Sequence, residues 1–266
     1  MMSTQHKRVA ISIVSHVQGK MVQTLLADLV RLVDASIEVL VTLNIPEPED
    51  FLAQSPVPVQ VIRNTLPMGF GANHNQALLR SQADFFLVMN PDVRLRDLDL
   101  EILVRTLDDE ALAACSPLVL NPSGRIEDNA RFFPRPSLIL KRVLTRLLGR
   151  ATTADYPLQD SGITRVNWIA GMCIMFNAHR YREVAGFDAR YFMYLEDADI
   201  CRRLSLRGYA VAVNSDTRVV HDARRATMKN AKHLRWHAKS MARFFVGSLS
   251  LNLRRRLRWS VRSDPK

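Results

Sequence analysis

Residues 186–203 read GFDARYFMYLEDADICRR, a stretch that sets acidic residues among aromatic and aliphatic side chains. Its four carboxylates are Asp188, Glu196, Asp197 and Asp199. Apolar residues follow Asp197 at helical spacing, which predicts a helix that begins at Glu196-Asp197, where free backbone N–H groups and the helix dipole favour negative charge. The pair is therefore either an ordinary helix cap or a general base at the mouth of a pocket with an aromatic floor.

The length and composition are those of a globular protein with a sizeable core. A chain of 266 residues with 47% hydrophobic content fits one large α/β domain or two small ones. Its three cysteines are widely spaced, which favours neither a zinc site nor a disulfide framework and fits a reducing cytosol. The apolar run near the N-terminus is too short for a signal peptide, and no run of about 18 apolar residues predicts a spanning helix. Any membrane contact is expected to be peripheral.

The formal charge of +11 is concentrated in the C-terminal tail. From Ala223 onward the chain has thirteen Lys or Arg and one acid, a balance of +12, which leaves 24 basic and 25 acidic residues, or −1, for the rest. Such a tail suits an anionic membrane, a nucleic acid or another polyanion, and charge does not choose between them.

Strand and helix patterns alternate along the first half of the chain. Strands are predicted at Val9–Val14, Ile37–Leu43 and Val57–Ile62, with a helix over Met21–Val33. This alternation is typical of a largely parallel sheet with helices on its faces. In such sheets, ligands bind at the carboxyl ends of the strands.

The second half continues this pattern with shorter elements. The sequence predicts a surface helix over Leu98–Leu107, a mobile loop over Thr152–Arg165, and strands at Ala111–Val119, Val166–Phe176, Tyr209–Val213 and Arg218–Val220. The sequence also predicts a basic amphipathic helix without acids over Leu138–Arg150, which either packs on the domain or enters a membrane interface.

Three segments carry candidate ligand-binding residues. Met68–Leu79, MGFGANHNQALL, has glycines that permit close approach of the backbone to a ligand, although a glycine turn that starts a helix would look similar. Asn90-Pro91-Asp92 ends an apolar strand, as either an Asx-Pro turn or a site for a cation bound to phosphates. His221 also ends a strand and is either structural or a metal ligand.

The order and spacing of these segments resemble family 2 of the glycosyltransferases, which have the GT-A fold. The resemblance extends from Val9 to about His221, and within the family it is greatest to bacterial rhamnosyltransferases of cell-surface polysaccharide assembly. It implies a GT-A domain over residues 1–222, with a mixed sheet flanked by helices. A basic helical extension over residues 223–266 would follow.

The resemblance also implies roles for individual residues. Asp197 would be the catalytic base, with Glu196 beside it as a second catalytic residue. Asp92 and His221 would hold Mg²⁺ or Mn²⁺. The donor nucleotide would contact Ser15, Asn44, Arg63, Gly69, Asn75 and Asn90. The acceptor side would include Trp168 and Gly171.

The implied reaction is an inverting transfer of a sugar, rhamnose from dTDP-rhamnose as first choice, to a hydroxyl of a lipid-linked saccharide. A UDP-linked donor is the alternative. Two departures from the family pattern affect the donor site: Asn44 is followed by Ile45-Pro46-Glu47 where the family has an Asp-Asn pair, and Asn90 replaces an acid. The first leaves recognition of the base open, and the second predicts weaker metal binding.

The tail is predicted to hold the enzyme on the cytoplasmic face of the membrane. Leu249, Leu253 and Leu257 repeat at one-turn spacing beside Arg254–Arg256 and Arg258, and basic residues near an anionic leaflet contribute about 1 kcal/mol each. The alternative is a charged helix packed on its own domain. Nucleic acid is not expected as a partner, because no recognition motif is present and such a role would leave the acidic residues unused.

Overall fold

The parallel half of the central sheet is built from the four apolar strands that lie nearest the N-terminus. The computed structural model describes residues 7–148, 154–222 and 231–262. Strands β3 (Gln60–Arg63), β2 (Ile37–Leu43), β1 (Val9–Ser15) and β4 (Phe85–Met89) lie side by side in that order, all parallel. Every residue of β4 is buried, since helices cover both faces of the sheet.

The other half of the sheet mixes strand directions. After β4 the order continues with β10 (Cys173–Asn177), β6 (Leu112–Leu120), β11 (Ala210–His221) and β5 (Val93–Asp97). Strand β10 is antiparallel to both of its neighbours, so β6 and β11 run in the same direction as β1 and β4. The sheet is mixed, as the fold class predicted, and less parallel than the first strands suggested.

Strand β11 joins two strands that were predicted separately. It runs unbroken through residues 214–217, where its register with β6 shifts, and it also pairs with β5 and β8 (Ile163–Val166). Strands β7 (Ala130–Arg131) and β9 (Trp168–Ile169) form a separate two-stranded sheet. The predicted loop Thr152–Arg165 thus ends in a strand, and its first two residues lie outside the described residues.

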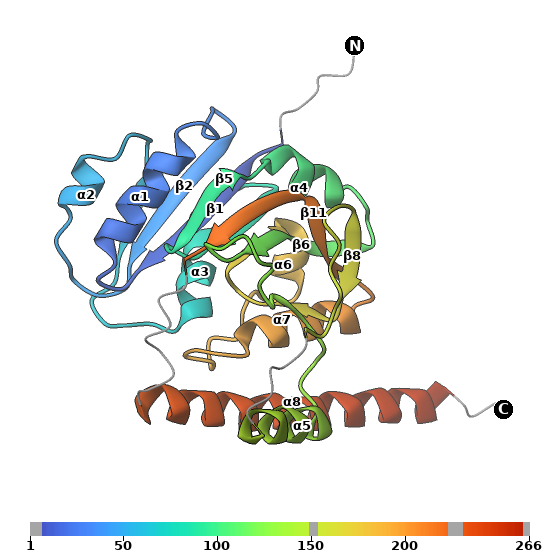
Figure 1. Cartoon of the computed structure of the whole chain (residues 1–266). Helices are drawn as coiled ribbons and strands as arrows, with labels where there is room; N and C mark the ends of the chain where they lie inside the picture. Colours follow the sequence, from blue (N-terminus) through green and yellow to red (C-terminus); the bar gives the residue numbers. More distant parts are fainter. Residues whose placement is uncertain (1–6, 149–153, 223–230, 263–266) are drawn as a thin grey trace, which may run out of the picture.

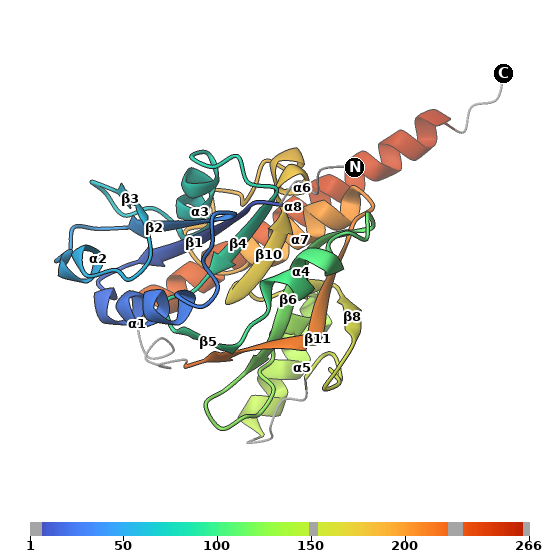
Figure 2. The same ribbon diagram turned by 90° about the horizontal axis from the view of Figure 1, so that it is seen from above.

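Helices divide between the two faces of the sheet (Figure 2). One core contains apolar side chains of α1 (Gly19–Leu29), α2 (Asp50–Ala53) and α4 (Leu100–Thr106). The opposite core contains those of α3 (Phe70–Leu78), α6 (Ala178–Glu183) and α7 (Glu196–Leu206). The helix predicted at Glu196-Asp197 is therefore α7, and it begins at the predicted residue.

Two further helices lie at the lower end of the molecule as drawn in Figure 1: α5 (Pro136–Leu147) and the 32-residue α8 (Ala231–Arg262). No helix in the described part of the chain is both long and apolar enough to cross a bilayer. The predicted domain boundary after residue 222 falls at the start of residues 223–230, which lie outside the described residues.

The first half of α8 packs on the body of the protein. The Ser240 hydroxyl donates to the carbonyl of Met193 at 2.8 Å, and Phe244 is buried beneath the guanidinium of Arg202, which lies 4.2 Å from the ring centroid. Arg202 also donates to the Phe244 carbonyl at 2.9 Å. This part of the helix therefore follows the alternative prediction of a helix packed on its own domain.

Candidate active site

The carboxyl ends of β1, β2, β4, β6 and β11 meet at one edge of the sheet, and Asp92 and His221 lie there together. His221 ends β11 and pairs in register with Val93, the residue that follows Asp92. Its Nε2 lies 3.3 Å from Asp92 Oδ1. The structure has a turn at Asn90-Pro91-Asp92, closed by a bond from the Val93 N–H to the Asn90 carbonyl at 3.2 Å, and this turn brings Asp92 to the histidine.

Glu127 is a third member of this group and was not predicted from the sequence. Its Oε2 lies 2.8 Å from Nδ1 of His221, so the carboxylate fixes the imidazole with Nε2 directed at Asp92. Burial lowers the pKa of His221, but its contacts with Asp92 and Glu127 outweigh burial, and the pKa is raised. Nothing in the local sequence marks Glu127, since its partner lies on a distant strand.

Asp92 and His221 suit a divalent cation with few protein ligands. Asp92 Oδ1 is buried and, among the described residues, its contact with His221 Nε2 at 3.3 Å is not a well-formed hydrogen bond, so this oxygen could accept a ligand. Within the described residues no cluster of three or more acidic, His or Cys side chains is arranged to hold a metal. The Asp92 carboxylate fits Mg²⁺, which typically uses one or two protein carboxylates and keeps water and substrate phosphate oxygens as its other ligands.

The Glu196-Asp197 pair follows a strained turn. Tyr194 and Leu195 both have left-handed backbone conformations, with φ of 73° and 65°, which are costly for residues other than glycine. The phenolic hydroxyl of Tyr194 bonds to His233 Nδ1 of α8 at 2.8 Å, and the Leu195 side chain is buried. These contacts hold the turn that presents the two acids at the start of α7.

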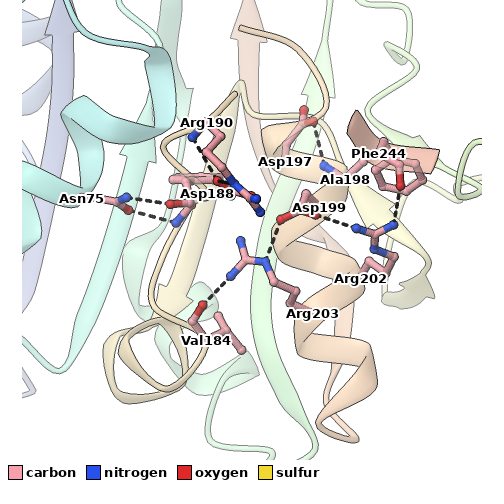
Figure 3. A network of polar contacts seen from close by, with 11 residues as sticks. Asn75, Val184, Asp188, Arg190, Asp197, Ala198, Asp199, Arg202, Arg203 and Phe244 are labelled. Atoms are coloured by element: carbon pink, nitrogen blue, oxygen red, sulfur yellow. Dashed lines mark hydrogen bonds and ion pairs between the residues drawn. The ribbon is translucent and has the colours of Figure 1, made fainter. Parts of the chain in front are cut away.

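The Asp197 carboxylate is oriented by two backbone N–H groups. Oδ2 accepts from Gly171 at 2.9 Å. Oδ1 accepts from Ala198 at 2.8 Å, as Figure 3 shows. Asp197 is half-buried, whereas Glu196 is only 6% exposed and its Oε2 has no hydrogen-bond partner. Leu195, not either acid, occupies the helix cap position, so the ordinary-cap interpretation does not describe the pair.

The backbone connects Asp197 to the Asn-Pro-Asp turn in two steps. The Asn90 N–H donates to the carbonyl of Met172 at 2.9 Å, and the neighbouring Gly171 N–H donates to Asp197. A methyl group added to Gly171 would lie 3.3 Å from the Phe70 ring and 3.7 Å from Asp197 Oδ2. Gly171 therefore leaves space beside the Asp197 carboxylate. Asp92 and Asp197 thus belong to the same edge of the sheet.

Burial raises the pKa of both acids of the pair. For Glu196 the charge of Asp197 adds to burial, and the pKa lies well above its usual range. For Asp197, burial outweighs the N–H groups of Ala198 and Gly171 and the nearby guanidinium of Arg131, which lower the pKa. Burial and mutual repulsion thus disfavour the ionised form of both acids, and the two N–H donors favour placing negative charge on Asp197 rather than on Glu196.

A carboxylate that acts as a base must be ionised, so the raised pKa of Asp197 predicts the pH dependence of turnover. We expect kcat to fall as the pH decreases through an apparent pKa above 3.8, the ordinary value for aspartate. Initial rates across a pH series, with tryptophan fluorescence to confirm folding at each pH, would measure this. A folded protein whose kcat stays constant down to pH 3.8 would contradict the raised pKa.

A cleft of about 550 Å³ opens at this edge of the sheet. It contains three of the predicted residues, Asn44, Asn90 and Asp92. Other lining residues include His16, Gln18, Met68, Phe70, Asn73, Phe192, Met193, Lys232, His233 and Trp236. His221, Glu196 and Asp197 do not line it. Asp197 is related to the cleft through Gly171, whose N–H it accepts and whose position adjoins the ring of the cleft-lining Phe70.

Asn44 shapes the cleft through three linked amides. Its Oδ1 accepts from the Met68 N–H at 2.8 Å and its Nδ2 donates to the Met68 carbonyl at 3.0 Å. Asn64 Nδ2 bonds to Oδ1 of both Asn44 and Asn73, at 3.2 and 2.7 Å. The loop between β3 and α3 is therefore fixed against the end of β2.

Several predicted donor-site residues do not reach the cleft. Arg63 is exposed and forms an ion pair with Glu49, with 2.8 Å between Nε and Oε1. Ser15 is buried and its hydroxyl accepts from the Gln18 N–H at 3.1 Å. At Gly69 an added Cβ would lie 2.7 Å from the carbonyl oxygen of Tyr191, so the close approach predicted there is to another part of the chain.

Asn75 also has a structural position in place of the predicted nucleotide contact. Its Oδ1 accepts from the Tyr181 hydroxyl at 2.6 Å and the Phe187 N–H at 2.9 Å, and its Nδ2 donates to the Phe187 carbonyl at 2.7 Å. These bonds hold the turn at Gly186 (φ 62°), which leads into the segment carrying the acids (Figure 3).

Removing the Asn75 side chain should therefore affect stability more than donor binding. We expect Asn75→Ala to lower the free energy of unfolding by about 2–3 kcal/mol, because buried partners on Tyr181 and Phe187 lose their bonds. Urea unfolding would measure this, and the donor KM should stay within about twofold of the wild type. A large rise in donor KM without loss of stability would instead support the predicted contact between Asn75 and the nucleotide.

Trp168, predicted on the acceptor side, packs away from the cleft. It is buried, its indole N–H donates to the carbonyl of Phe132 at 2.9 Å, and the guanidinium of Arg131 lies 5.4 Å from its ring centroid. It stabilises the β7–β9 sheet, whose strand β9 leads to Gly171. Its connection with the site is thus through the backbone that positions Asp197.

Comparison with known proteins identifies the family. The model of glycosyl transferase family 2 matches residues 14–159, more than half of the chain. The chain belongs to glycosyl transferase family 2. This confirms the family predicted from the sequence.

Two curated relatives of this family-2 chain are rhamnosyltransferases. The N-acetylglucosaminyl-diphospho-decaprenol L-rhamnosyltransferase of Mycobacterium tuberculosis is 29% identical over 190 residues, covering 68% of this chain and 61% of that protein. Rhamnosyltransferase WbbL of Escherichia coli is 29% identical over 191 residues, covering 67% and 70%. The chain thus spans less than two thirds of the length of the mycobacterial relative.

Solved structures confirm the predicted GT-A fold. GalNAc-T7 with UDP, GalNAc and Mn²⁺ has a TM-score of 0.63 at 13% identity, covering 82% of this chain and 44% of that one. Mannosyltransferase PcManGT from Pyrobaculum calidifontis, with GDP-Man and Mn²⁺, has a TM-score of 0.62 at 16% identity, covering 93% and 65%. At these identities the likeness concerns the fold of this family-2 member.

Proposed function

We propose that this chain is an inverting glycosyltransferase that moves rhamnose from dTDP-rhamnose to a hydroxyl of a saccharide carried on a lipid diphosphate. The names of both curated relatives support the sugar, and the name of the mycobacterial relative supports the acceptor class. The observation that carries the reaction is the backbone connection from Asn90 through Met172 and Gly171 to Asp197. It links the turn that carries Asp92, which lines the cleft, to Asp197, which is suited to act as a base.

In the proposed mechanism, Asp92 and His221 would hold a divalent cation, with Glu127 keeping the histidine oriented. Such a cation offsets negative charge on the leaving phosphate. The cleft edge formed by His16, Gln18 and Asn44 then faces the nucleoside, as ligands of open α/β sheets usually bind at strand ends.

Asp197 is proposed to accept the proton of the acceptor hydroxyl. A sugar hydroxyl is a poor nucleophile at neutral pH, so removal of its proton as the glycosidic bond forms lowers the barrier. The two N–H groups on Asp197 hold the carboxylate in one orientation. Attack on the face opposite the leaving diphosphate inverts the anomeric centre, and the proton is carried away on Asp197.

The test is a transfer assay with the purified chain and Mg²⁺ or Mn²⁺. The donors are dTDP-rhamnose and a panel of UDP-sugars, and the acceptor is N-acetylglucosamine diphosphate on a short prenyl chain. We expect rhamnose transfer with inversion, read by mass spectrometry and anomeric NMR couplings, and dependence on the metal. Turnover with a UDP-sugar alone would show that the donor is a UDP-sugar and not dTDP-rhamnose. If the chain bound neither dTDP-rhamnose nor any UDP-sugar, the proposed function would be refuted.

We further propose peripheral attachment to the cytoplasmic membrane surface through the basic C-terminal helix. Figure 1 supports this choice, because the basic helix α5 and helix α8 lie at the same end of the molecule. The acidic residues of the chain before residue 223 balance its basic ones, whereas the tail carries +12. Lipid-linked acceptors are held at such a surface.

Deleting Leu249–Lys266 removes six of the basic residues and is expected to abolish flotation with anionic vesicles. Transfer to a short, water-soluble acceptor should persist, because the described contacts of α8 with the body, at Ser240, Arg243 and Phe244, lie outside the deletion. Vesicles of neutral phosphatidylcholine serve as the control surface. Equal flotation of the full chain and the deletion variant would disprove membrane attachment by this segment.

A further inference from the structure

Helix α8 forms one wall of the cleft, which the basic tail gave no reason to expect. Lys232, His233 and Trp236, from its first two turns, line the cleft opposite the strand ends. The Trp236 ring lies 4.8 Å from that of Phe192, centroid to centroid, with 33° between the planes. Both rings remain partly exposed, so this aromatic pair presents a surface to the cleft.

Trp236 is not the residue that anchors the helix. The anchors are Ser240, which bonds to the Met193 carbonyl, and Phe244, which is 2% exposed under Arg202. Arg243 adds a bond from its guanidinium to the carbonyl of Arg190. These contacts fix α8 one to two turns beyond Trp236. Anchoring of the helix therefore does not explain the large, partly exposed indole at this position.

The aromatic pair is continuous with the surroundings of Asp197. The Phe192 carbonyl accepts from the Phe70 N–H at 2.9 Å, and the Phe70 ring lies beside Gly171, whose N–H holds the Asp197 carboxylate. The acceptor hydroxyl has to reach Asp197. The wall that adjoins this base, and not the strand ends that face the nucleoside, is therefore the surface an acceptor would meet.

We propose that Trp236, paired with Phe192, is the platform for the acceptor sugar, specifically the pyranose ring next to the lipid diphosphate. The inference rests on the proposed transferase function. A pyranose offers an apolar C–H face that packs on a flat aromatic ring, and aromatic linings are common in ligand sites. Lys232, whose ammonium lies 4.9 Å from the Trp236 ring centroid, places positive charge where the diphosphate follows the sugar.

The continuity of α8 gives this site a direct relation to the membrane. The helix has 32 residues, a length of roughly 48 Å at 1.5 Å per residue, with the cleft residues in its first turns and an Arg-rich segment in its last. One rigid element would thus connect the surface that holds the lipid with the cleft that receives its head group.

The test compares Trp236→Leu and Trp236→Phe in the full chain, with Leu234→Ala as the matched control. Leu234 is 74% exposed on the same helix and does not line the cleft. The acceptor probe is N-acetylglucosaminyl-diphospho-citronellol, which is short enough to remain in solution and so removes membrane effects. Acceptor KM and donor KM are measured separately with dTDP-rhamnose, and melting temperatures confirm folding.

We expect Trp236→Leu to raise the acceptor KM by about 3- to 10-fold, the range of an aromatic contact, with the donor KM within about twofold. Trp236→Phe should keep most of the affinity, and Leu234→Ala should match the wild type. Three results would overturn the acceptor platform while leaving transfer intact. They are an unchanged acceptor KM in Trp236→Leu, the same acceptor KM in Trp236→Leu and Trp236→Phe, and equal rises in acceptor KM and donor KM. A wild-type chain that binds no nucleotide sugar would overturn the proposed function and this inference together.

Discussion

Asp197→Asn is expected to lower kcat for sugar transfer by about 10²–10⁴-fold, the usual contribution of a positioned general base. The asparagine oxygen can still accept from Gly171 or Ala198, so the start of α7 should keep its geometry. Donor KM should therefore change little. Steady-state kinetics with saturating donor and acceptor would measure the loss.

The matched control is Glu196→Gln, on the neighbouring residue. Because burial and the Asp197 charge raise the pKa of Glu196 well above its usual range and so disfavour its ionised form, the neutral glutamine is a close replacement. We expect this variant to keep most of the wild-type kcat. If Asp197→Asn retained more than about a tenth of kcat, or if Glu196→Gln were the more damaging change, the base would have been assigned to the wrong acid.

Asp92→Ala is expected to abolish the stimulation of turnover by Mg²⁺ or Mn²⁺, a loss on the order of 10²-fold or more, since a metal supplies several kcal/mol of charge stabilisation. The substitution removes the only carboxylate in contact with His221 Nε2 among the described residues. Rates measured against metal concentration would show a flat response in place of saturation.

Asp222→Ala controls for the loss of one negative charge nearby. The Asp222 side chain is exposed. Its contact with Asp92 is through the backbone, where the Asp222 N–H donates to the Asp92 carbonyl at 2.9 Å. Its replacement should leave the metal response unchanged. A variant Asp92→Ala that still saturates with Mn²⁺ at wild-type rates would remove the metal from the mechanism.

The sequence predicted those parts of the site that depend on strand ends. Apolar strands with a uniform direction have carboxyl ends at one edge of the sheet, so Asp92 and His221 could be expected there. The start of α7 at Glu196 was likewise predictable, because apolar spacing and acids in a first turn are local signals. These features need no knowledge of which distant segments touch.

Residues whose role depends on a distant partner could not be predicted. Glu127 is defined by His221, and Arg63 is neutralised by Glu49 from a neighbouring loop. The glycines of the Met68–Leu79 segment were interpreted as making room for a ligand, but a glycine makes room equally for another stretch of chain, here at Tyr191. The dense charge of the tail likewise concealed the cleft-lining Trp236.

The central claim is that Asp92 and Asp197 serve one donor and one acceptor from a single edge of the sheet. An X-ray structure of the chain with Mn²⁺ and dTDP-rhamnose, with the anomalous signal of the metal, tests it most directly. The account predicts a metal peak between Asp92 Oδ1 and His221 Nε2, and a donor sugar directed toward Gly171 and Asp197. A metal bound elsewhere, or a donor sugar turned away from Asp197, would contradict it.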